Sequence, residues 1–411
     1  MADPAGLGRE MLEAARRGDA VRLGALLAEE RGLENVSDEW GQTPLFMACW
    51  NGHEAVVRLL VEAGADVNKA TTDDGATPLY MACREGHDTL VRLLVEAGAD
   101  VNKARTDDGT TPLLMACWNG HEAVVRQLLE AGADANKAKT DVGATPLYVA
   151  CQNGHDSVVG LLVEAGADAN KAKTDVGATP LYVACQNGHD SVVGLLVEAG
   201  ADANKAKTDV GATPLYVACQ NGHDSVVGLL VEAGADVNRA RTDIGTTPLY
   251  MACQNGRDAV VRQLVEAGAD VNKATTDDGA TPLVAACRRQ DTRLVRRLLA
   301  AGADPNISDR QGKSPLDVAA FECYSAATVW LLREAGAPVP LSGVSAWAHL
   351  ALLRLNGYTD VIEALTTPTT WERRFRLLAW RTSAQRCRHD CACAAAVVTH
   401  ESVSSGECAV A

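Results

Sequence analysis

Hydrophobic and polar residues alternate along this chain in short blocks that recur at one fixed interval. The dipeptide Thr-Pro recurs eight times at intervals of 34 residues, from Thr43-Pro44 to Thr281-Pro282, and Ser314-Pro315 follows after 33 more. A period of this size is typical of a solenoid, in which each repeat packs only against its neighbours. The length of 411 residues therefore does not measure a number of independent domains.

Residues 140–173 form one repeat and show which elements the pattern predicts. Thr145 is suited to cap a helix with proline in its first turn, and Gly154 is placed to end it. A second helix with a stripe of valines and leucines is expected from Asp156 until Gly166, and a polar, hairpin-like connection follows. Helices of about 8–11 residues are too short to be stable alone, so stacking must stabilise them.

Three adjacent repeats are almost the same. Residues 140–173 and 174–207 are identical, and residues 208–241 differ from them at three positions, which suggests recent tandem duplication. Gly160, Gly194 and Gly228 stand inside the second helices, where other repeats carry arginine. Glycine inside a helix costs about 1 kcal/mol relative to alanine. We therefore predict that the centre of the stack is its least stable part.

The stretch from Gly75 to Asn102 resembles an ankyrin repeat, with its TPL, GH and GADVN motifs, and the resemblance covers residues 41–337. It implies an all-α solenoid of stacked helix-turn-helix repeats with hairpin-like loops, in a curved, elongated array. Two features depart from the family pattern. The histidine that usually follows TPL is replaced, for example by Phe46 or Tyr80, and each loop carries one residue more than in a 33-residue repeat.

The ends of the repeat array are degenerate. We expect an N-terminal capping repeat in residues 1–40, the solenoid in residues 41–340 and a C-terminal capping repeat in residues 341–365. Residues 366–411 are expected to be a basic and then low-complexity tail that is mostly disordered. The repeat that starts at Ser314 contains one extra residue, which we expect in the turn between its two helices.

The net charge of −15 argues against a nucleic-acid-binding protein, which would need a basic face. The chain has no run of about 18 apolar residues and does not start like a secretory signal. We therefore expect a cytoplasmic protein.

Eight cysteines, from Cys49 to Cys287, occupy one position in successive repeats. A redox or metal ladder is one interpretation, and a small buried hydrophobic residue in place of alanine is the other. The second is favoured because adjacent repeats lie about 8–10 Å apart, whereas a disulfide needs Cα atoms within about 7 Å. Unpaired thiols also favour a reducing compartment.

The remaining candidate chemistry is weak. The histidine after the helix-ending glycine in six repeats is expected to bond nearby backbone. The pairs Asp73-Asp74, Asp107-Asp108 and Asp277-Asp278 are expected at exposed tips, with no burial to shift the pKa of their carboxyl groups. No nucleotide-binding loop, metalloprotease motif or nucleophile elbow is present in the sequence. We expect neither an enzyme nor a bound metal or cofactor.

The ankyrin resemblance implies a protein partner that contacts hairpin tips and the exposed side of the first helices. Tryptophan and arginine, which are enriched in binding hot spots, mark those positions in the N-terminal repeats. The candidate residues are Trp50, Arg84, Glu85 and Trp118, with an apolar row at the tips formed by Val142, Val176, Val210 and Ile244. Two alternatives stay open: the tryptophans pack against adjacent tips, and neighbouring tips cover the apolar row.

The C-terminal segment carries different signals. Residues 371–388 hold six arginines and one glutamate, which suits a basic amphipathic helix that contacts an acidic membrane or the acidic solenoid. Cys408 and the three residues after it fit a prenylation pattern, with a chance match in an alanine-rich tail as the alternative. Cys387, Cys391 and Cys393 do not have a common zinc spacing.

The sequence thus predicts a monomeric, non-enzymatic protein-interaction scaffold or adaptor. The first alternative is an adaptor tethered to a membrane through Cys408. A regulatory subunit of an enzyme complex is the second.

Overall fold

The computed structural model describes residues 4–30, 32–339 and 344–369, and these fall into two compact units that we describe separately. The first unit extends to Asp270 and the second begins at Val271. All regular structure in the described ranges is helical, and no strand occurs in them. No helix in these ranges has both the length and the apolar character needed to span a bilayer.

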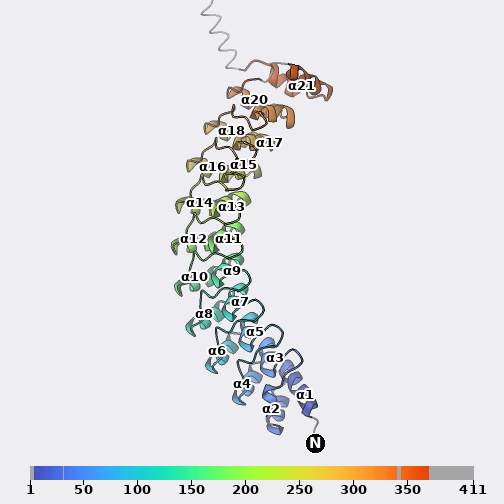
Figure 1. Cartoon of the computed structure of the whole chain (residues 1–411), viewed down its shortest axis with the longest axis vertical. Helices are drawn as coiled ribbons and strands as arrows, with labels where there is room; N and C mark the ends of the chain where they lie inside the picture. The colour runs from blue at the N-terminus through green and yellow to red at the C-terminus, as the bar shows by residue number, and fades with distance from the viewer. Residues whose placement is uncertain (1–3, 31, 340–343, 370–411) are drawn as a thin grey trace, which may run out of the picture. The chain divides into compact units, whose positions relative to one another are not determined.

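The first unit is a series of helix pairs stacked in chain order (Figure 1). The first helices of the pairs are α1 (Pro4–Arg17), α3 (Pro44–Asn51), α5 (Pro78–Glu85), α7 (Pro112–Asn119), α9 (Pro146–Asn153), α11 (Pro180–Asn187), α13 (Pro214–Asn221) and α15 (Pro248–Asn255). The second helices are α2 (Ala20–Glu29), α4 (Glu54–Glu62), α6 (Asp88–Glu96), α8 (Glu122–Glu130), α10 (Asp156–Glu164), α12 (Asp190–Glu198), α14 (Asp224–Glu232) and α16 (Asp258–Glu266). A 3₁₀ turn, η1 (Leu33–Asn35), follows α2. First helices pack on first helices and second helices on second helices, which gives two layers.

Local capping explains where these helices begin and end. Before α9, the hydroxyl of Thr145 accepts a hydrogen bond from the N–H of Tyr148 at 3.1 Å, and proline occupies the first turn. Gly154 ends the helix with φ +75°, a left-handed conformation that glycine adopts without steric cost. The same threonine cap and glycine end recur from α3 to α15, as the sequence predicts.

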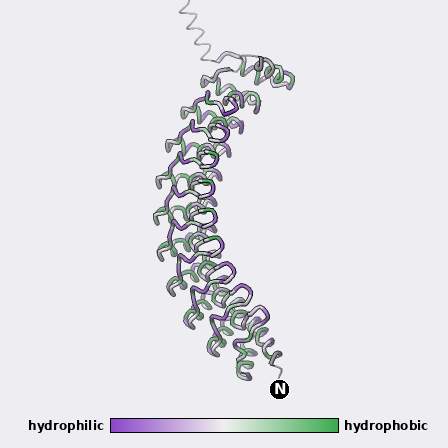
Figure 2. Tube along the Cα trace, in the orientation of Figure 1, coloured by the Kyte–Doolittle hydropathy of each residue, from purple (hydrophilic) through white to green (hydrophobic). Residues whose placement is uncertain are grey.

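The core of each repeat consists of small aliphatic side chains between the two layers. In α9 and α10 these include Leu147, Cys151, Val159 and Leu162, all fully buried. Hydrophobic and polar segments accordingly alternate along the trace (Figure 2). Because each core is thin and repeated, it needs few aromatic residues.

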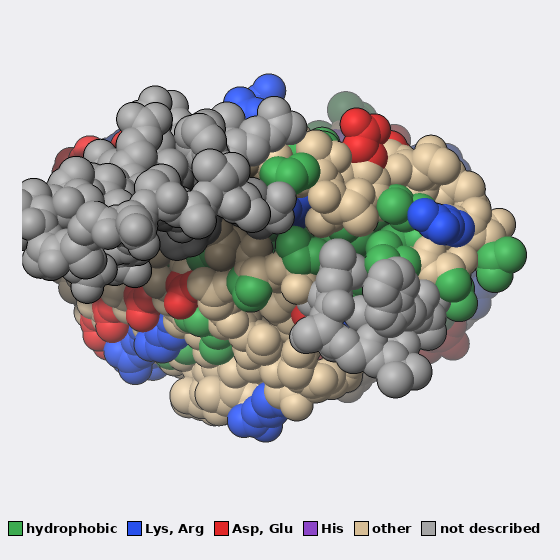
Figure 3. Space-filling view, turned by 90° about the horizontal axis from the view of Figure 1, so that it is seen from above, with side chains coloured by type: hydrophobic (Ala, Val, Ile, Leu, Met, Phe, Trp, Pro, Cys, Tyr) green, Lys and Arg blue, Asp and Glu red, His purple; other side chains and the backbone are tan. Residues whose placement is uncertain are grey.

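The second unit continues the helix pairs and then departs from them. Its elements are α17 (Pro282–Arg288), α18 (Thr292–Ala300), α19 (Pro315–Asp317), η2 (Val318–Glu322), α20 (Ala326–Glu334), α21 (Val344–Leu355) and α22 (Thr359–Thr366). The buried Arg333 guanidinium donates hydrogen bonds to the carbonyl oxygens of Ala364 (2.6 Å) and Thr367 (2.5 Å) at the end of α22. Leu352 and Leu355 of α21 are exposed. Seen from above, the molecule shows hydrophobic side chains among polar ones at its surface (Figure 3).

The extra residue of the repeat at Ser314 is not confined to the turn between its helices, so our prediction of its position was wrong. It widens the end of the first helix into the π-helical turn η2. There the N–H of Cys323 donates to the carbonyl of Val318, five residues back, at 2.9 Å. Tyr324 then takes the left-handed conformation (φ +53°) that glycine has elsewhere, and its ring stacks on Tyr358 at 4.2 Å between centroids.

Candidate functional site

The two predicted tryptophans lie at the surface of the first unit. Trp50 is the second-last residue of α3 with 41% of its surface exposed, and Trp118 has the corresponding place in α7 with 45% exposed. Trp50 makes an edge-to-face contact with Phe46 at 6.2 Å. Packing on a neighbour therefore accounts for part of the Trp50 ring and leaves a large part of it accessible.

Arg84 and Glu85, also predicted, lie at the end of α5 between the two tryptophans in sequence order. Both side chains are exposed and pair with each other at 3.0 Å. The Arg84 guanidinium also lies over the Trp50 ring, 5.6 Å from its centroid. Its backbone carbonyl accepts hydrogen bonds from Asn119 (2.9 Å) and His121 (3.0 Å), which fixes the end of α5 to the next repeat.

A third exposed tryptophan, Trp40, was missed by the sequence argument. It is 52% exposed at the first tip, and its carbonyl accepts a hydrogen bond from the N–H of Thr72 at 2.9 Å. Val142 has the same place in its own tip, since its carbonyl accepts from Thr174. Alignment of the residue before the tip glycine from the first repeat onward would have found Trp40.

Two open grooves flank α1, and one of them reaches Trp40. One, of about 550 Å³, is lined by Arg9, Leu12, Glu39 and Trp40 among others. The other, of about 570 Å³, lies between α1 and Met47 of α3.

The predicted apolar row at the tips is half-buried. This holds for Val142, Val176, Val210 and Ile244. The carbonyl groups of the three valines accept hydrogen bonds from the next tip at 3.0–3.1 Å, so successive tips are joined through their backbones. Each of these four side chains is therefore partly accessible to solvent and partly covered.

The second aspartate of each tip pair, Asp74, Asp108 or Asp278, is partly buried and has a lowered pKa, so our expectation was wrong for these three carboxylates. Partial burial raises the pKa of Asp74, but hydrogen bonds from the Thr71 hydroxyl (2.6 Å) and the Ala76 N–H (3.0 Å) outweigh it and lower the pKa overall. Asp108 follows the same balance, with Thr110 and the Lys139 ammonium (3.0 Å) lowering its pKa.

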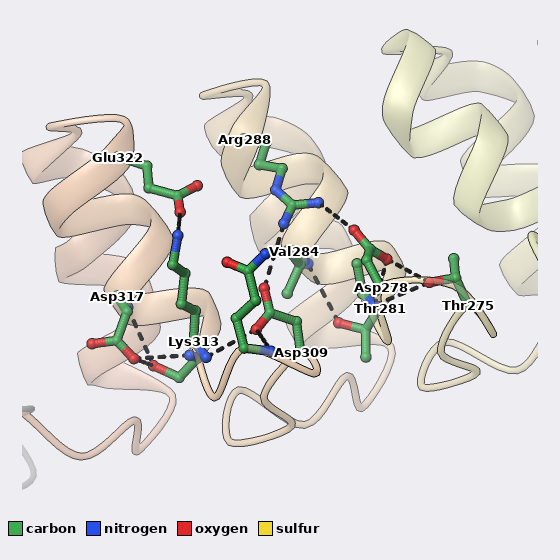
Figure 4. Close-up of polar contacts among 12 residues, drawn as sticks. Thr275, Asp278, Thr281, Val284, Arg288, Asp309, Lys313, Asp317 and Glu322 are labelled. Carbon is green, nitrogen blue, oxygen red and sulfur yellow. Dashed lines mark hydrogen bonds and ion pairs between the residues drawn. The ribbon is translucent and has the colours of Figure 1, made fainter.

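In the second unit, burial likewise raises the pKa of Asp278, while Thr275 and the Ala280 N–H outweigh it. Arg288, at the end of α17, bridges Asp278 (3.0 Å) and the buried Asp309 (3.5 Å), as Figure 4 shows. A side chain at the end of the first helix α17 therefore contacts the loop tip that holds Asp278.

Tyrosines replace the family's histidine, and loop cations of the next repeat cover them. Arg105 lies 5.5 Å from the Tyr80 ring centroid, and the same pairing joins Lys173 to Tyr148, Lys207 to Tyr182 and Arg241 to Tyr216. Burial raises the pKa of Tyr148 and Tyr182 to about 12. The partners are 25 residues apart, a spacing that could have revealed the pairing in the sequence.

The eight repeated cysteines are buried free thiols, in agreement with a small hydrophobic role. Burial raises the pKa of each thiol for which a shift is resolved, for example Cys49 and Cys185. A neutral, inaccessible thiol is neither a nucleophile nor a metal ligand.

The repeated histidines bond backbone across the repeat boundary. Nε2 of His155 lies 3.1 Å from the carbonyl oxygen of Trp118, and His189 has the same relation to Gln152 at 3.2 Å. In residues 4–30, 32–339 and 344–369, no group of three or more His, Cys, Asp or Glu side chains is arranged to hold a metal ion. Cys387, Cys391, Cys393, Cys408 and residues 371–388 lie outside the described ranges.

Family models for ankyrin repeats match residues 40–72, 68–139, 135–207, 200–275 and 264–319. These matches cover more than half of the chain, which therefore belongs to the ankyrin repeat family. Ankyrin repeats generally mediate protein–protein interaction, and the fold is typically a non-enzymatic module.

The chain is also similar to parts of two known proteins. The palmitoyltransferase akr1 of Emericella nidulans is 39% identical over 62 residues, which are 15% of this chain and 8% of that protein's length. The crystal structure of the human ASB11 ankyrin repeat domain is 31% identical, with a TM-score of 0.49, and the match covers 56% of this chain and 99% of that domain.

Proposed function

We propose that this chain is a non-enzymatic scaffold or adaptor that binds a protein partner through the hairpin tips and first helices of its N-terminal repeats. The observation that carries the proposal is the exposure of Trp40, Trp50 and Trp118 at those positions. Large aromatic side chains on a fixed backbone bind with little loss of conformational entropy, which is why they dominate binding hot spots.

The state of the reactive groups supports a non-enzymatic role. Cys49 and its counterparts are buried thiols, and the ring nitrogens of His155 and His189 contact backbone carbonyls. The repeated cysteines and these two histidines are therefore engaged in holding the described repeats together.

A cytoplasmic monomer remains our prediction. Lipid attachment at Cys408 remains a prediction from the sequence pattern, on a residue outside the described ranges.

The proposal is tested by capture of partners on the immobilised full chain and on a Trp50→Ala/Trp118→Ala double variant. Truncating hot-spot residues costs 2 kcal/mol or more, so we expect the affinity of the captured partner to fall at least about 30-fold. Leu355→Ala, which truncates an exposed apolar side chain in the second unit, is the control. Equal capture by all three proteins, with helical content unchanged, would refute the proposal.

A further inference from the structure

The surface proposed to bind the partner is strongly acidic. We define the N-terminal surface as the tips 38–40, 71–74, 105–108 and 139–142 with the first-helix ends 50–51, 84–85, 118–119 and 152–153. It holds eight carboxylates and three cations, a net charge of −5. The cations are engaged within the surface, because Arg84 pairs with Glu85, Arg105 with Asp74 and Asp107, and Lys139 with Asp108.

The corresponding positions in the next three repeats give an internal comparison. The tips 173–176, 207–210 and 241–244 hold three carboxylates and three cations, and the helix ends there carry glutamine and asparagine. That part of the same face is neutral and has no tryptophan. Acidity and exposed aromatic rings therefore coincide in the N-terminal repeats.

The chain itself shows how a cation is held on this surface. Arg84 lies over Trp50, in the repeat before its own, at 5.6 Å. Trp118 has the same helix-end place, but the next repeat supplies the uncharged Gln152. The backbone around residues 84 and 152 is equivalent, since both carbonyl groups accept hydrogen bonds from the asparagine and histidine of the following repeat. Among the described residues, no cation lies over the Trp118 ring.

We infer that the partner of the N-terminal surface presents a basic segment, and that one of its arginine or lysine side chains occupies the face of Trp118 as Arg84 occupies that of Trp50. The inference rests on the proposed function and adds the chemistry of the partner. A cation on a tryptophan ring is worth about 0.5–2 kcal/mol, and the surrounding net negative charge favours the same ligand.

The test is a selection of random dodecapeptides on the immobilised full chain, followed by fluorescence anisotropy of the selected peptides. We expect enrichment of arginine and lysine. In the Gln152→Arg variant the chain's own guanidinium covers Trp118, so binding of these peptides should weaken about tenfold. Gln186→Arg makes the same change in charge in the same backbone setting. The equivalent residue of the preceding repeat is there Gln152, not a tryptophan, so this variant should leave peptide affinity within about twofold.

Two further arms define the result. Trp118→Leu keeps an apolar side chain without the aromatic face, and should weaken basic peptides at least threefold. A synthetic peptide of residues 371–388 is measured in parallel, because it is basic. If that peptide binds more tightly than every selected one and depends on Trp118, the occupant is this chain's own segment and the inference of a separate partner is overturned.

Neutral or acidic peptides, no enrichment, or equal loss in Gln152→Arg and Gln186→Arg would also overturn it. The proposed function fails separately, if partner capture is insensitive to Trp50→Ala/Trp118→Ala. Tryptophan-dependent capture of a partner whose contact segment is not basic would leave the proposed function standing and remove this inference alone.

Discussion

Individual polar side chains join each repeat of the first unit to the next. Asn68 shows this most fully: its side-chain oxygen accepts from the N–H of Asp100 (2.8 Å), its amide donates to the Gly98 carbonyl (3.1 Å), and its own carbonyl accepts from Lys103 (2.7 Å). Asn102 and Asn136 make the same three contacts with the residues of their own following repeats. Because the side chains satisfy backbone groups, they fix the loops without a large hydrophobic contact.

Replacing Gly194 with alanine is expected to stabilise the chain by about 1 kcal/mol. The glycine lies inside α12 without a left-handed φ, and a Cβ built there meets no atom within 4 Å. Urea unfolding measures the gain. Gly188→Ala is the control and should destabilise, because Gly188 has φ +76° and its Cβ would lie 2.5 Å from His223. A loss of stability in Gly194→Ala would contradict the prediction.

The buried thiols predict a loss of stability in alkali. Burial raises the pKa of Cys185 above its ordinary value of 9.0, so above pH 9 the unfolded thiol releases its proton while the folded thiol keeps it. Stability from this group is complete below pH 9 and falls as pH rises, by up to about 1.4 kcal/mol per pH unit for each thiol. Urea midpoints between pH 8 and 10 measure the slope, which Cys185→Ala should reduce. A midpoint that does not move across this range would rule the effect out.

At the level of helices and loops, local sequence signals were sufficient to predict where the helices lie. They were not sufficient to predict the contacts between repeats. Threonine, proline and glycine act on their own turns, so the sequence located the helices correctly. The covering of Tyr148 by Lys173 joins two repeats, and the partial burial of Asp74 depends on how Thr71 folds back in its loop. Neither follows from the hydrophobic period. The π-helical turn before Cys323 was likewise missed because an extra residue can widen a helix or lengthen a turn.

The second helices α10, α12 and α14 are expected to exchange their amide protons faster than α6 and α8. The helices α10, α12 and α14 contain Gly160, Gly194 and Gly228. At the equivalent position α8 has Arg126, which pairs with Glu122 at 2.9 Å. A cost of about 1 kcal/mol corresponds to an exchange rate about fivefold higher for local opening. Hydrogen exchange with mass spectrometry of the full chain checks this, and uniform protection through residues 150–235 would refute it.

For the chain as a whole, the identity of adjacent repeats makes one of them dispensable. Removing residues 174–207 leaves residues 208–241 after a repeat of unchanged sequence, and gives residues 140–173 a following repeat that differs from the deleted one at only three positions. Since each repeat contributes its own stability and its neighbour contacts, the shortened chain should fold with lower total stability and the same helix content per residue.

Circular dichroism and urea unfolding test this. The N-terminal surface lies outside the deleted segment, so partner affinity should not change. Removing residues 188–204 instead deletes α12 and leaves α11 without its second helix, and should cause aggregation or partial unfolding. Equal behaviour of the two deletions would mean that the repeat is not the unit of folding.

Because each of eight repeats has one buried cysteine at the same position, alkylation of these cysteines can count how many repeats have opened. After replacement of the other five cysteines by serine, every repeat that opens in the presence of an alkylating reagent gains one adduct. The intact mass spectrum is then a histogram of how many repeats have opened together. A single jump from none to eight would show all-or-none unfolding, and a ladder of intermediate masses would show that repeats open one at a time.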